Sequence, residues 1–584
     1  MPFCVSLLWI HAACVTVVMV SSYSINDHRS SNDINLDFDK LERLGQTDSL
    51  IKALKQIAQN SHDCGVRDVP KLRRKFLTND SITCNDGSPA GYFIRKSYGS
   101  KKWIIFLEGG WYCFDDVSCQ MRASTDNMRH FMTSKGWPKK KSVTGMLSWN
   151  PEENPYYFHS NIVYIPYCSS DTWSGTAPKG TNGNEYAFMG SLILEQVIKD
   201  LIPRGLKHAT KLILTGSSAG GTGVLVNLDR VADQMAVLAP EVEVRGVADS
   251  GWFLDYPQYR YKDCVAALTC APMDGTKRGI RMWQGRVPEA CQAEYPESEH
   301  WRCYFGYRIY KNIKTPLYVI QHLFDEAQIL VDNVFEQTQI RGDQSAAMVS
   351  RSQWQYLHKL GQEVRNTLQN VSAVFAPACL SHEVLLRPDW FNISINGIKL
   401  GQSIYCWENS YKYDKCIRST TSVNAIEPLN ETLQGDSPKA NTTSKKDRRR
   451  HKRKKDRKRR RRKNKKKKLR RREKGERKGD NRANRRQRES KEKNKNRRRR
   501  HQYPSGSCFH HLIDSCPLPQ CNESCPKYRN RYTGDEMDFL RMFIQYGLDR
   551  KEIAELLGQD MSAVEHMDDN AVRRLIMKFV NKGS

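Results

Sequence analysis

The chain lacks several features that would fix its class at once. Beyond residues 3–20 it has no apolar run approaching the roughly 20 residues that a helix needs to span a bilayer, which excludes a polytopic membrane protein. It has no recognisable internal repeat, which excludes a solenoid. Outside residues 445–500 it has no excess charge of either sign, with 57 basic and 57 acidic residues, so its folded parts are neutral.

The first 22 residues have the pattern of a secretory signal peptide. The apolar run 3–20 is followed by Ser21 and Ser22, small residues typical of a cleavage point, but no Lys or Arg precedes it, which leaves an uncleaved anchor open. Of the 18 cysteines, sixteen follow this segment, and an oxidising compartment would pair them in up to eight disulfides. We therefore expect a secreted, extracellular protein, with glycosylation at the Asn79 sequon.

The cysteines also lack a CxxC pair. Zinc is the competing interpretation for the cluster formed by Cys516, Cys521 and Cys525. Structural zinc sites typically contain closely spaced cysteine pairs, and secreted chains use cysteine mainly for disulfides. We therefore expect no metal site.

Strand and helix patterns alternate along residues 61–425, after a polar, flexible lead-in at 23–60. Most predicted strands are short, continuous, β-branched-rich runs, typical of strands buried on both faces of a parallel sheet. The alternation predicts an α/β-hydrolase-like esterase domain with a mainly parallel sheet flanked by helices. The predicted strands are 81–84 and 91–94, which would form a hairpin, then 103–107, 162–166, 212–215, 242–247 and 317–320, and the predicted helices are 190–201, 221–238 and 350–368.

A strongly basic insertion interrupts this pattern at residues 426–504. Residues 445–500 contain 37 Lys/Arg and 7 Asp/Glu, which accounts for the whole net charge of +30. Such a run, with few apolar groups, is typical of a disordered polycation. Outside the cell its natural partners are sulfated glycosaminoglycans such as heparan sulfate, bound through counterion release. Residues 505–584, Cys-rich and then helical, are predicted to complete the esterase domain.

A serine lies where a predicted strand gives way to a predicted helix. Residues 216–220 read G-S-S-A-G, directly behind the apolar run 212–214. This is the pattern of a nucleophile elbow, in which a strained turn presents a serine at the edge of the sheet. A Gly/Ser-rich loop without chemistry is the alternative, because a single G-x-S-x-G is common by chance. Ser218 is therefore a candidate nucleophile that needs partners.

A nucleophilic serine needs a base and an acid that orients the base, in this fold in the order Ser, Asp/Glu, His. Asp325 closely follows predicted strand 317–320, at the edge where open α/β sheets bind ligands, whereas Asp332 lies further along a predicted helix. Only two histidines lie between Asp325 and the basic tract. His358 falls inside a predicted helix and His382 follows a loop-like segment, so chain order and elimination select Asp325 and His382.

Ester hydrolysis also needs backbone N–H donors for its oxyanion. Ala219, directly after the nucleophile, supplies one by the geometry of the elbow. The others typically come from a Gly-rich loop after an earlier strand, and IIFLEGGWY at residues 104–112 has that form. Gly110 and Trp111 are the predicted donors, with a Gly-Gly hairpin turn as the alternative.

Four segments together resemble the animal carboxylesterases of the pectin acetylesterase family. They are LEGGWYC at 107–113, GSSAGGTG at 216–223, ADSGWFLD at 248–255 and FDEAQ at 324–328. The resemblance extends from about Cys64 to Cys416 and resumes at Cys508. Several long motifs in one order are far more specific than an isolated elbow.

The resemblance implies a secreted, cofactor-free carboxylesterase that removes the palmitoleoyl ester from a serine of Wnt proteins and so silences them. It implies the triad Ser218, Asp325 and His382 and the donors Gly110, Trp111 and Ala219. It also implies association with glypican-type heparan sulfate proteoglycans, which would retain the protein at the cell surface. The apolar acyl pocket would be lined by Trp111, Tyr112, Phe253, Tyr304, Phe305, Ala327 and Val331.

The residues leave three other functions open. An esterase for acetylated polysaccharide would use the same chemistry, although the bulky Trp111 and Tyr112 argue against a small acyl group. A heparan-sulfate-binding protein without catalysis would not need a complete triad. Nucleic-acid binding is suggested by the polycation and by residues 551–564, which superficially resemble a helix-turn-helix, but the signal sequence and the many cysteines argue against it.

Overall fold

The computed structural model describes residues 70–335, 350–420 and 508–527, with residues 554, 560–568 and 571. The predicted signal peptide 1–22, the lead-in 23–60, the basic insertion 426–504 and most of the C-terminal helical segment lie outside the described residues. Among the helices that are described, none is long and apolar enough to cross a membrane.

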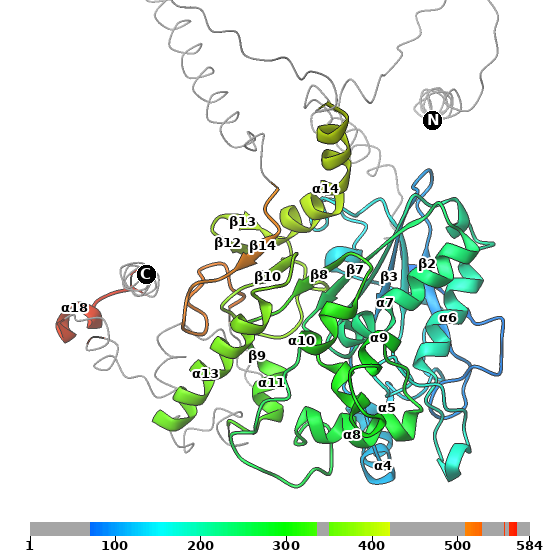
Figure 1. The fold of residues 1–584 in the computed structure, drawn as a ribbon, viewed down its shortest axis with the longest axis horizontal. Helices are drawn as coiled ribbons and strands as arrows, with labels where there is room; N and C mark the ends of the chain where they lie inside the picture. The colour runs from blue at the N-terminus through cyan, green and yellow to red at the C-terminus, as the bar shows by residue number, and fades with distance from the viewer. Residues whose placement is uncertain are drawn as a thin grey trace, which may run out of the picture. The chain divides into compact units, whose positions relative to one another are not determined.

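A ten-stranded sheet forms the centre of the fold, in the order β14-β10-β8-β7-β6-β3-β5-β2-β1-β4 (Figure 1). The seven strands from β14 to β5 are parallel, and β2, β1 and β4 continue the sheet in antiparallel pairs. The predicted α/β fold with a mainly parallel sheet is confirmed. The strands are β1 (Leu72–Phe76), β2 (Gly91–Arg95), β3 (Lys102–Leu107), β4 (Lys140–Lys141), β5 (Asn161–Ile165), β6 (Lys211–Ser217), β7 (Glu243–Asp249), β8 (Leu317–Ile320), β10 (Val374–Ala376) and β14 (His511–Ile513).

Two further pairs of short strands and a set of helices surround this sheet. Strands β9 (Phe324–Asp325) and β11 (Leu380–Ser381) pair in parallel, and β12 (Ser394–Ile395) and β13 (Ile398–Lys399) pair antiparallel. The helices are α4 (Asp116–Ser124), α5 (Asp126–Arg129), α6 (Gly190–Leu201), α7 (Ala219–Leu238), α8 (Pro272–Trp283), α9 (Glu289–Gln292), α10 (Gly306–Ile309), α11 (Glu326–Val331), α13 (Arg351–Leu368), α14 (Leu400–Thr420) and α18 (Met561–Glu565).

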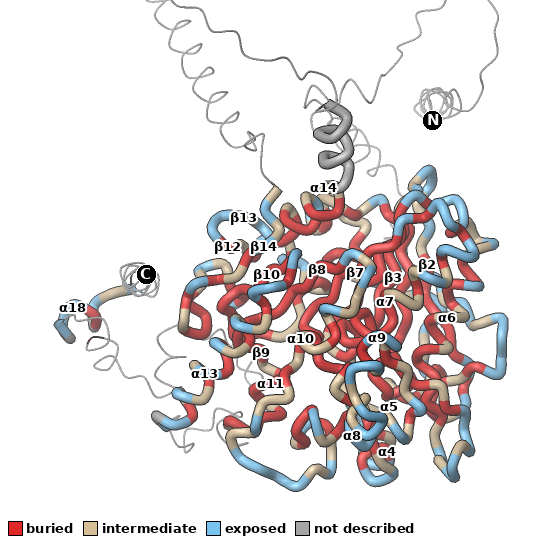
Figure 2. Tube along the Cα trace, viewed as in Figure 1, coloured by how far each residue is buried: buried red, intermediate tan, exposed pale blue. Residues whose placement is uncertain are grey.

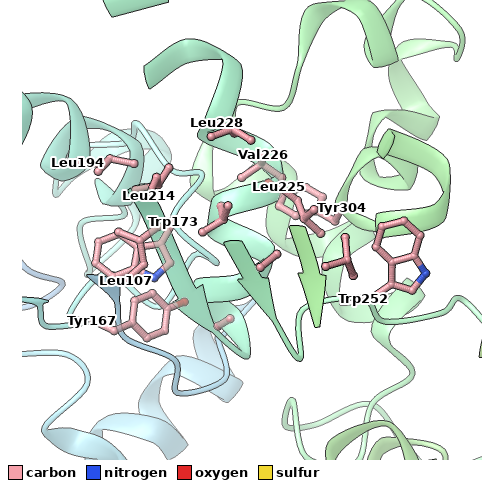
Figure 3. Packing of buried hydrophobic residues seen from close by; sticks show 14 of the residues in the cluster. Leu107, Tyr167, Trp173, Leu194, Leu214, Leu225, Val226, Leu228, Trp252 and Tyr304 are labelled. Atoms are coloured by element: carbon pink, nitrogen blue, oxygen red, sulfur yellow. The ribbon is translucent and has the colours of Figure 1, made fainter. Parts of the chain in front are cut away.

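The alternation of side chains along the central strands creates two apolar cores. In β3, Trp103 and Ile105 belong to one cluster of buried residues, whereas Ile104 and Phe106 belong to the other, because successive side chains of a strand point to opposite faces. Helices α6, α7 and α13 contribute to the first cluster and α14 to the second. Figure 2 shows the strands buried between these layers, and Figure 3 shows part of the first cluster, to which α7 contributes Leu225.

The predicted hairpin is wrong in its first strand. β2 pairs with β1 rather than with residues 81–84, and in the intervening loop Thr83 makes only an isolated bridge to Pro89. Strand β1 reads LRRKF with a single buried side chain, Leu72. Because its side chains are mostly charged and exposed, no apolar run in the sequence indicates a strand here. Its backbone nevertheless forms hydrogen bonds with β2.

Seven disulfides join described cysteines, in agreement with the predicted disulfide-stapled fold. Two of them connect residues on either side of the basic insertion, and the three cysteines of the 516–525 cluster are all disulfide-bonded. The pairs are Cys84–Cys168, Cys113–Cys119, Cys264–Cys270, Cys291–Cys303, Cys379–Cys525, Cys406–Cys508 and Cys516–Cys521. Since β14 also pairs with β10, residues 508–527 are joined to the rest of the described fold both through the central sheet and through disulfides.

Candidate active site

Ser218 lies in the sharp turn between β6 and α7. Its backbone has φ 57° and ψ −122°, a conformation that is costly for a residue with a side chain. The Ser218 N–H donates to the Asp249 carbonyl at 2.9 Å, which holds the turn in place. Glycine is required behind the turn, because a Cβ on Gly220 would lie 2.0 Å from the Leu107 carbonyl oxygen. The strand–turn–helix context expected of the G-x-S-x-G motif is therefore present.

His382 and Asp325 are brought to Ser218 from a distant part of the chain. The Ser218 Oγ lies 2.8 Å from His382 Nε2, and His382 Nδ1 lies 2.9 Å from Asp325 Oδ2. The pairing of β9 with β11 sets Ser381 opposite Asp325. Because the histidine directly follows β11, this register brings the acid and the base side by side.

Both carboxylate oxygens of Asp325 are hydrogen-bonded. Asp325 is the N-cap of α11, and its Oδ1 accepts the N–H groups of Ala327 and Gln328 at 2.9 and 3.2 Å. Its Oδ2 accepts a hydrogen bond from Gln321 Nε2 at 3.1 Å in addition to the contact with His382. These donors fix the orientation of the carboxylate.

The acidic surroundings of His382 raise its pKa. Burial alone would lower it, but the charge and hydrogen bond of Asp325, together with the charges of Glu383 and Asp249, raise the pKa of His382 to about 9. A histidine accepts a proton only when its ring is neutral. The base therefore becomes available as the pH rises.

This shift predicts the pH dependence of ester hydrolysis. The value of kcat/KM for a p-nitrophenyl ester is expected to increase with pH through an apparent pKa near 9, since protonated His382 cannot accept the Ser218 proton. Initial rates between pH 5 and 10, corrected for spontaneous hydrolysis with the Ser218→Ala variant, measure this acidic limb of the pH–rate profile. A limb near the ordinary histidine value of about 6.5 contradicts the expectation.

The loop after β3 presents backbone N–H groups beside Ser218. A Cβ on Gly109 would lie 2.8 Å from the Ser218 Cβ, so the loop passes directly against the serine. Gly110 and Trp111 both have positive φ, 144° and 60°. In the part of the chain that the structure describes, the N–H groups of Gly110, Trp111 and Ala219 donate to no protein acceptor. Three donors are thus available to an oxygen bound beside the serine.

An apolar cavity lies beside Ser218. Six of the seven residues predicted for the acyl pocket line it. Ala327 is not among them; it lies in the first turn of α11, which Asp325 caps by accepting the Ala327 N–H. Three threonines and a proline of the lining were not predicted, because nothing in the sequence around such residues indicates a pocket. The lining residues are Trp111, Tyr112, Thr172, Ser218, Ala219, Thr222, Phe253, Pro272, Thr276, Tyr304, Phe305 and Val331.

The alternative acid and base have other partners. Asp332 accepts a hydrogen bond from Gln328 Nε2 at 3.0 Å, and burial raises the pKa of Asp332 to about 8. The ring of His358 packs against Trp354 within α13, with centroids 5.0 Å apart. Of the candidates, Asp325 and His382 are the pair that the fold brings to Ser218.

A buried carboxylate that sequence reasoning missed joins the elbow to the histidine loop. Asp249 Oδ2 accepts the Ser217 hydroxyl at 2.7 Å and the N–H groups of Val384 and Leu385 at 2.9 and 3.0 Å. Burial raises the pKa of Asp249. The sequence feature that could have identified Asp249 is the one that indicates Asp325, namely a carboxylate just after a predicted parallel strand. Asp249 thus anchors both sides of the serine–histidine contact.

Comparisons with known proteins agree with this architecture. The pectinacetylesterase family profile matches residues 71–431. The chain is 41% identical over 537 residues to the palmitoleoyl-protein carboxylesterase NOTUM of Mus musculus, covering 92% of this chain and 88% of the relative. For the Homo sapiens protein of that name the identity is 40% over 537 residues, covering 92% and 89%. For the Drosophila melanogaster protein it is 49% over 364 residues, covering 61% and 51%. The resemblance seen in the four motifs is confirmed, and the chain belongs to the pectinacetylesterase family.

Proposed function

We propose that this protein is a secreted serine carboxylesterase that removes the palmitoleoyl ester from a serine of Wnt proteins and so negatively regulates Wnt signalling. The observation that carries the proposal is an apolar cavity lined by Ser218, whose Oγ is hydrogen-bonded to His382, itself paired with Asp325. Relatives that align with about nine-tenths of the chain are palmitoleoyl-protein carboxylesterases, and the seven disulfides suit an extracellular setting.

In the first half of the reaction Ser218 becomes acylated. Its Oγ attacks the ester carbonyl while His382 Nε2 accepts the proton, and Asp325 holds the ring in the tautomer that leaves Nε2 free. The N–H groups of Gly110, Trp111 and Ala219 stabilise the developing oxyanion, and each such donor is typically worth about 3 to 4 kcal/mol. His382 then passes its proton to the departing serine hydroxyl of the substrate protein.

In the second half, water releases the fatty acid. His382 removes a proton from a water molecule, which attacks the acyl-Ser218 ester through a second oxyanion in the same N–H cluster. The bond between the acyl carbon and Ser218 Oγ then breaks, and His382 returns the proton to Oγ. The acyl chain stays in the cavity during both steps. Each buried methylene contributes about 0.8 kcal/mol, so the cavity favours long acyl groups over short ones.

The family profile gives one reason to keep an acetylesterase as the second candidate. The apolar lining by Trp111, Phe253, Tyr304 and Phe305 favours a lipid instead. The test is to compare the release of palmitoleate and of acetate from the same serine peptide carrying either ester. Preferred release of acetate overturns the lipid-esterase assignment.

We also propose that residues 445–500 bind heparan sulfate, including that of glypicans, and so keep the enzyme at the cell surface. The chain leaves the fold through α14 and re-enters at Cys508, which is bonded to Cys406. The net charge of +30 carried by residues 445–500 suits a sulfated polysaccharide.

Removing this tract is expected to affect retention and not chemistry. Deleting residues 445–500 removes a net charge of +30, so elution from immobilised heparin should move to much lower salt, while kcat for a small ester stays within about twofold, since no residue of the tract belongs to the proposed triad. A variant with every Lys and Arg of the tract replaced by Gln controls for length. A tenfold loss of turnover in either variant contradicts tethering as the sole role.

Glycosylation is proposed at Asn79. This asparagine is exposed in the loop between β1 and β2, and its Oδ1 accepts the N–H and hydroxyl of Ser81. The sequon is therefore accessible in the folded protein, and a glycan there would lie over a surface without pocket-lining residues of the site.

A further inference from the structure

A wall of the acyl cavity is held from both sides by two buried glutamines. Phe253 lines the cavity, and its chain neighbours direct their N–H groups at glutamine side chains. The Trp252 N–H donates to Gln321 Oε1 at 3.0 Å, and the Leu254 N–H donates to Gln328 Oε1 at 2.9 Å. Both glutamines are 2% exposed. The backbone on each side of Phe253 is thus fixed by a dedicated acceptor.

The same two glutamines contact the acid of the triad, but in different ways. Gln321 uses its side chain, and its Nε2 donates at 3.1 Å to Asp325 Oδ2, the oxygen that also faces His382 Nδ1. Gln328 uses its backbone N–H, which donates to Asp325 Oδ1 at 3.2 Å. The side-chain Nε2 of Gln328 instead donates to Asp332 at 3.0 Å. Only Gln321 therefore links the acid to the cavity wall through one amide group.

Phe253 lines the cavity and lies near the base. Its ring centroid is 6.2 Å from that of His382. The preceding residue is also fixed by its side chain, since the Trp252 indole N–H donates to Thr367 Oγ1 at 3.0 Å and a Cβ on Gly306 would lie 2.3 Å from the indole ring. Gln321 completes this frame because a primary amide can accept one hydrogen bond and donate another at the same time.

We propose that Gln321 is a positioning residue that couples Asp325 to Phe253, so that one amide sets both the basicity of His382 and the shape of the acyl cavity. The inference rests on the proposed function, because it takes Asp325 and His382 as acid and base. The side chain of Gln328 supports the cavity wall and contacts Asp332, but not the acid of the triad. Basicity and acyl selectivity are therefore separable by mutation.

Three variants separate the two roles. Gln321→Leu removes the donor to Asp325 and the acceptor for Trp252. Gln321→Met keeps a weak acceptor, its thioether sulfur, for the Trp252 N–H and loses the donor to Asp325 without adding a charge. Gln328→Leu loses the acceptor for Leu254 and leaves the backbone N–H to Asp325. Thermal unfolding of each variant identifies any that fail to fold, and the remaining two still test the coupling.

The expected shifts have definite signs. Without the Gln321 donor, more of the negative charge of Asp325 rests on the oxygen facing His382, so the acidic limb of kcat/KM should move upward by about 0.5 to 1 pH unit in both Gln321 variants. Gln328→Leu should leave the limb unchanged. The octanoate-to-acetate ratio of kcat/KM should fall about tenfold in Gln321→Leu and Gln328→Leu, the equivalent of one to two methylenes left unburied. It should change less than about threefold in Gln321→Met.

Other titratable groups near His382 do not confound this comparison. They are Asp249 at the end of β7, Glu383, which directly follows His382 in the chain, and His322 after β8. All three are the same in every variant, so a difference between the limbs reports the substitution itself.

The failure of this inference differs from a failure of the proposed function. If the parent enzyme does not hydrolyse long-chain esters, the proposed function is wrong. If the parent does so, yet Gln321→Leu keeps the parental limb, or Gln321→Leu and Gln328→Leu keep the parental selectivity, the coupling is wrong. Equal shifts of both limb and selectivity in all three variants also overturn it, because they indicate a general disturbance of the site.

Discussion

Replacing Ser218 with alanine is expected to lower kcat for ester hydrolysis by about a millionfold. The loss removes the nucleophile that His382 contacts at 2.8 Å, and in other serine hydrolases removal of the nucleophile alone costs about as much as removal of the whole triad. Substrate binding should change little, since the cavity lining is otherwise intact. Single-turnover kinetics with p-nitrophenyl octanoate and with a palmitoleoylated peptide measure the effect.

The neighbouring serine provides a matched control. Ser217 precedes the proposed nucleophile, but its hydroxyl donates to Asp249 Oδ2 at 2.7 Å rather than to His382. Ser217→Ala is therefore expected to keep turnover within about tenfold of the parent, the cost of one hydrogen bond to a charged group. Full activity in Ser218→Ala, or equal losses in both variants, contradicts the assignment of the nucleophile.

The preference for long acyl chains is expected to be the second large effect. Octanoate has six more methylenes than acetate, and at about 0.8 kcal/mol for each buried methylene the cavity can favour octanoate by about a thousandfold in kcat/KM. Thr276, 5% exposed on α8, lines the cavity. Thr276→Phe places a ring in that space and should reduce the octanoate preference about a hundredfold while acetate turnover stays close to parental.

The next residue of the helix controls for the substitution itself. Lys277 is exposed and does not line the cavity, so Lys277→Phe should retain the parental ratio. A p-nitrophenyl ester series from acetate to decanoate measures the full profile. A parental profile in Thr276→Phe contradicts the view that this cavity holds the acyl chain, and a parent that prefers acetate supports the acetylesterase alternative.

The order of residues along the chain is enough to predict the three proposed triad residues. Ser218 was selected by a motif between a strand and a helix, Asp325 by its position after a strand, and His382 by elimination. These are local or ordinal properties that a sequence displays directly. The pairing of β9 with β11, which brings the acid beside the base, is a contact between distant two-residue strands, and no periodicity reveals strands that short.

The supporting residues could not be assigned in the same way. Gln321 and Gln328 act through the backbone N–H groups of Trp252 and Leu254, and a glutamine in a sequence does not indicate which amide it will meet. The family resemblance implies a pocket role for Ala327, which does not line the cavity beside Ser218 and whose N–H donates to Asp325. The fold class can be predicted because continuous β-branched runs indicate strands buried on both faces. Strand β1 has mostly charged, exposed side chains and gives no such indication.

The position of β14 has a consequence for biosynthesis. This strand pairs with β10, yet about 135 residues separate the end of one from the start of the other. At typical synthesis rates of 5 to 20 residues per second, the ribosome needs roughly 7 to 27 s to deliver it. During that time the β10 edge is open, and the thiols of Cys379 and Cys406 have been made but their partners have not. Until β14 is synthesised, the nascent chain therefore has an unpaired strand edge and two unpaired thiols, features that favour aggregation and incorrect disulfides.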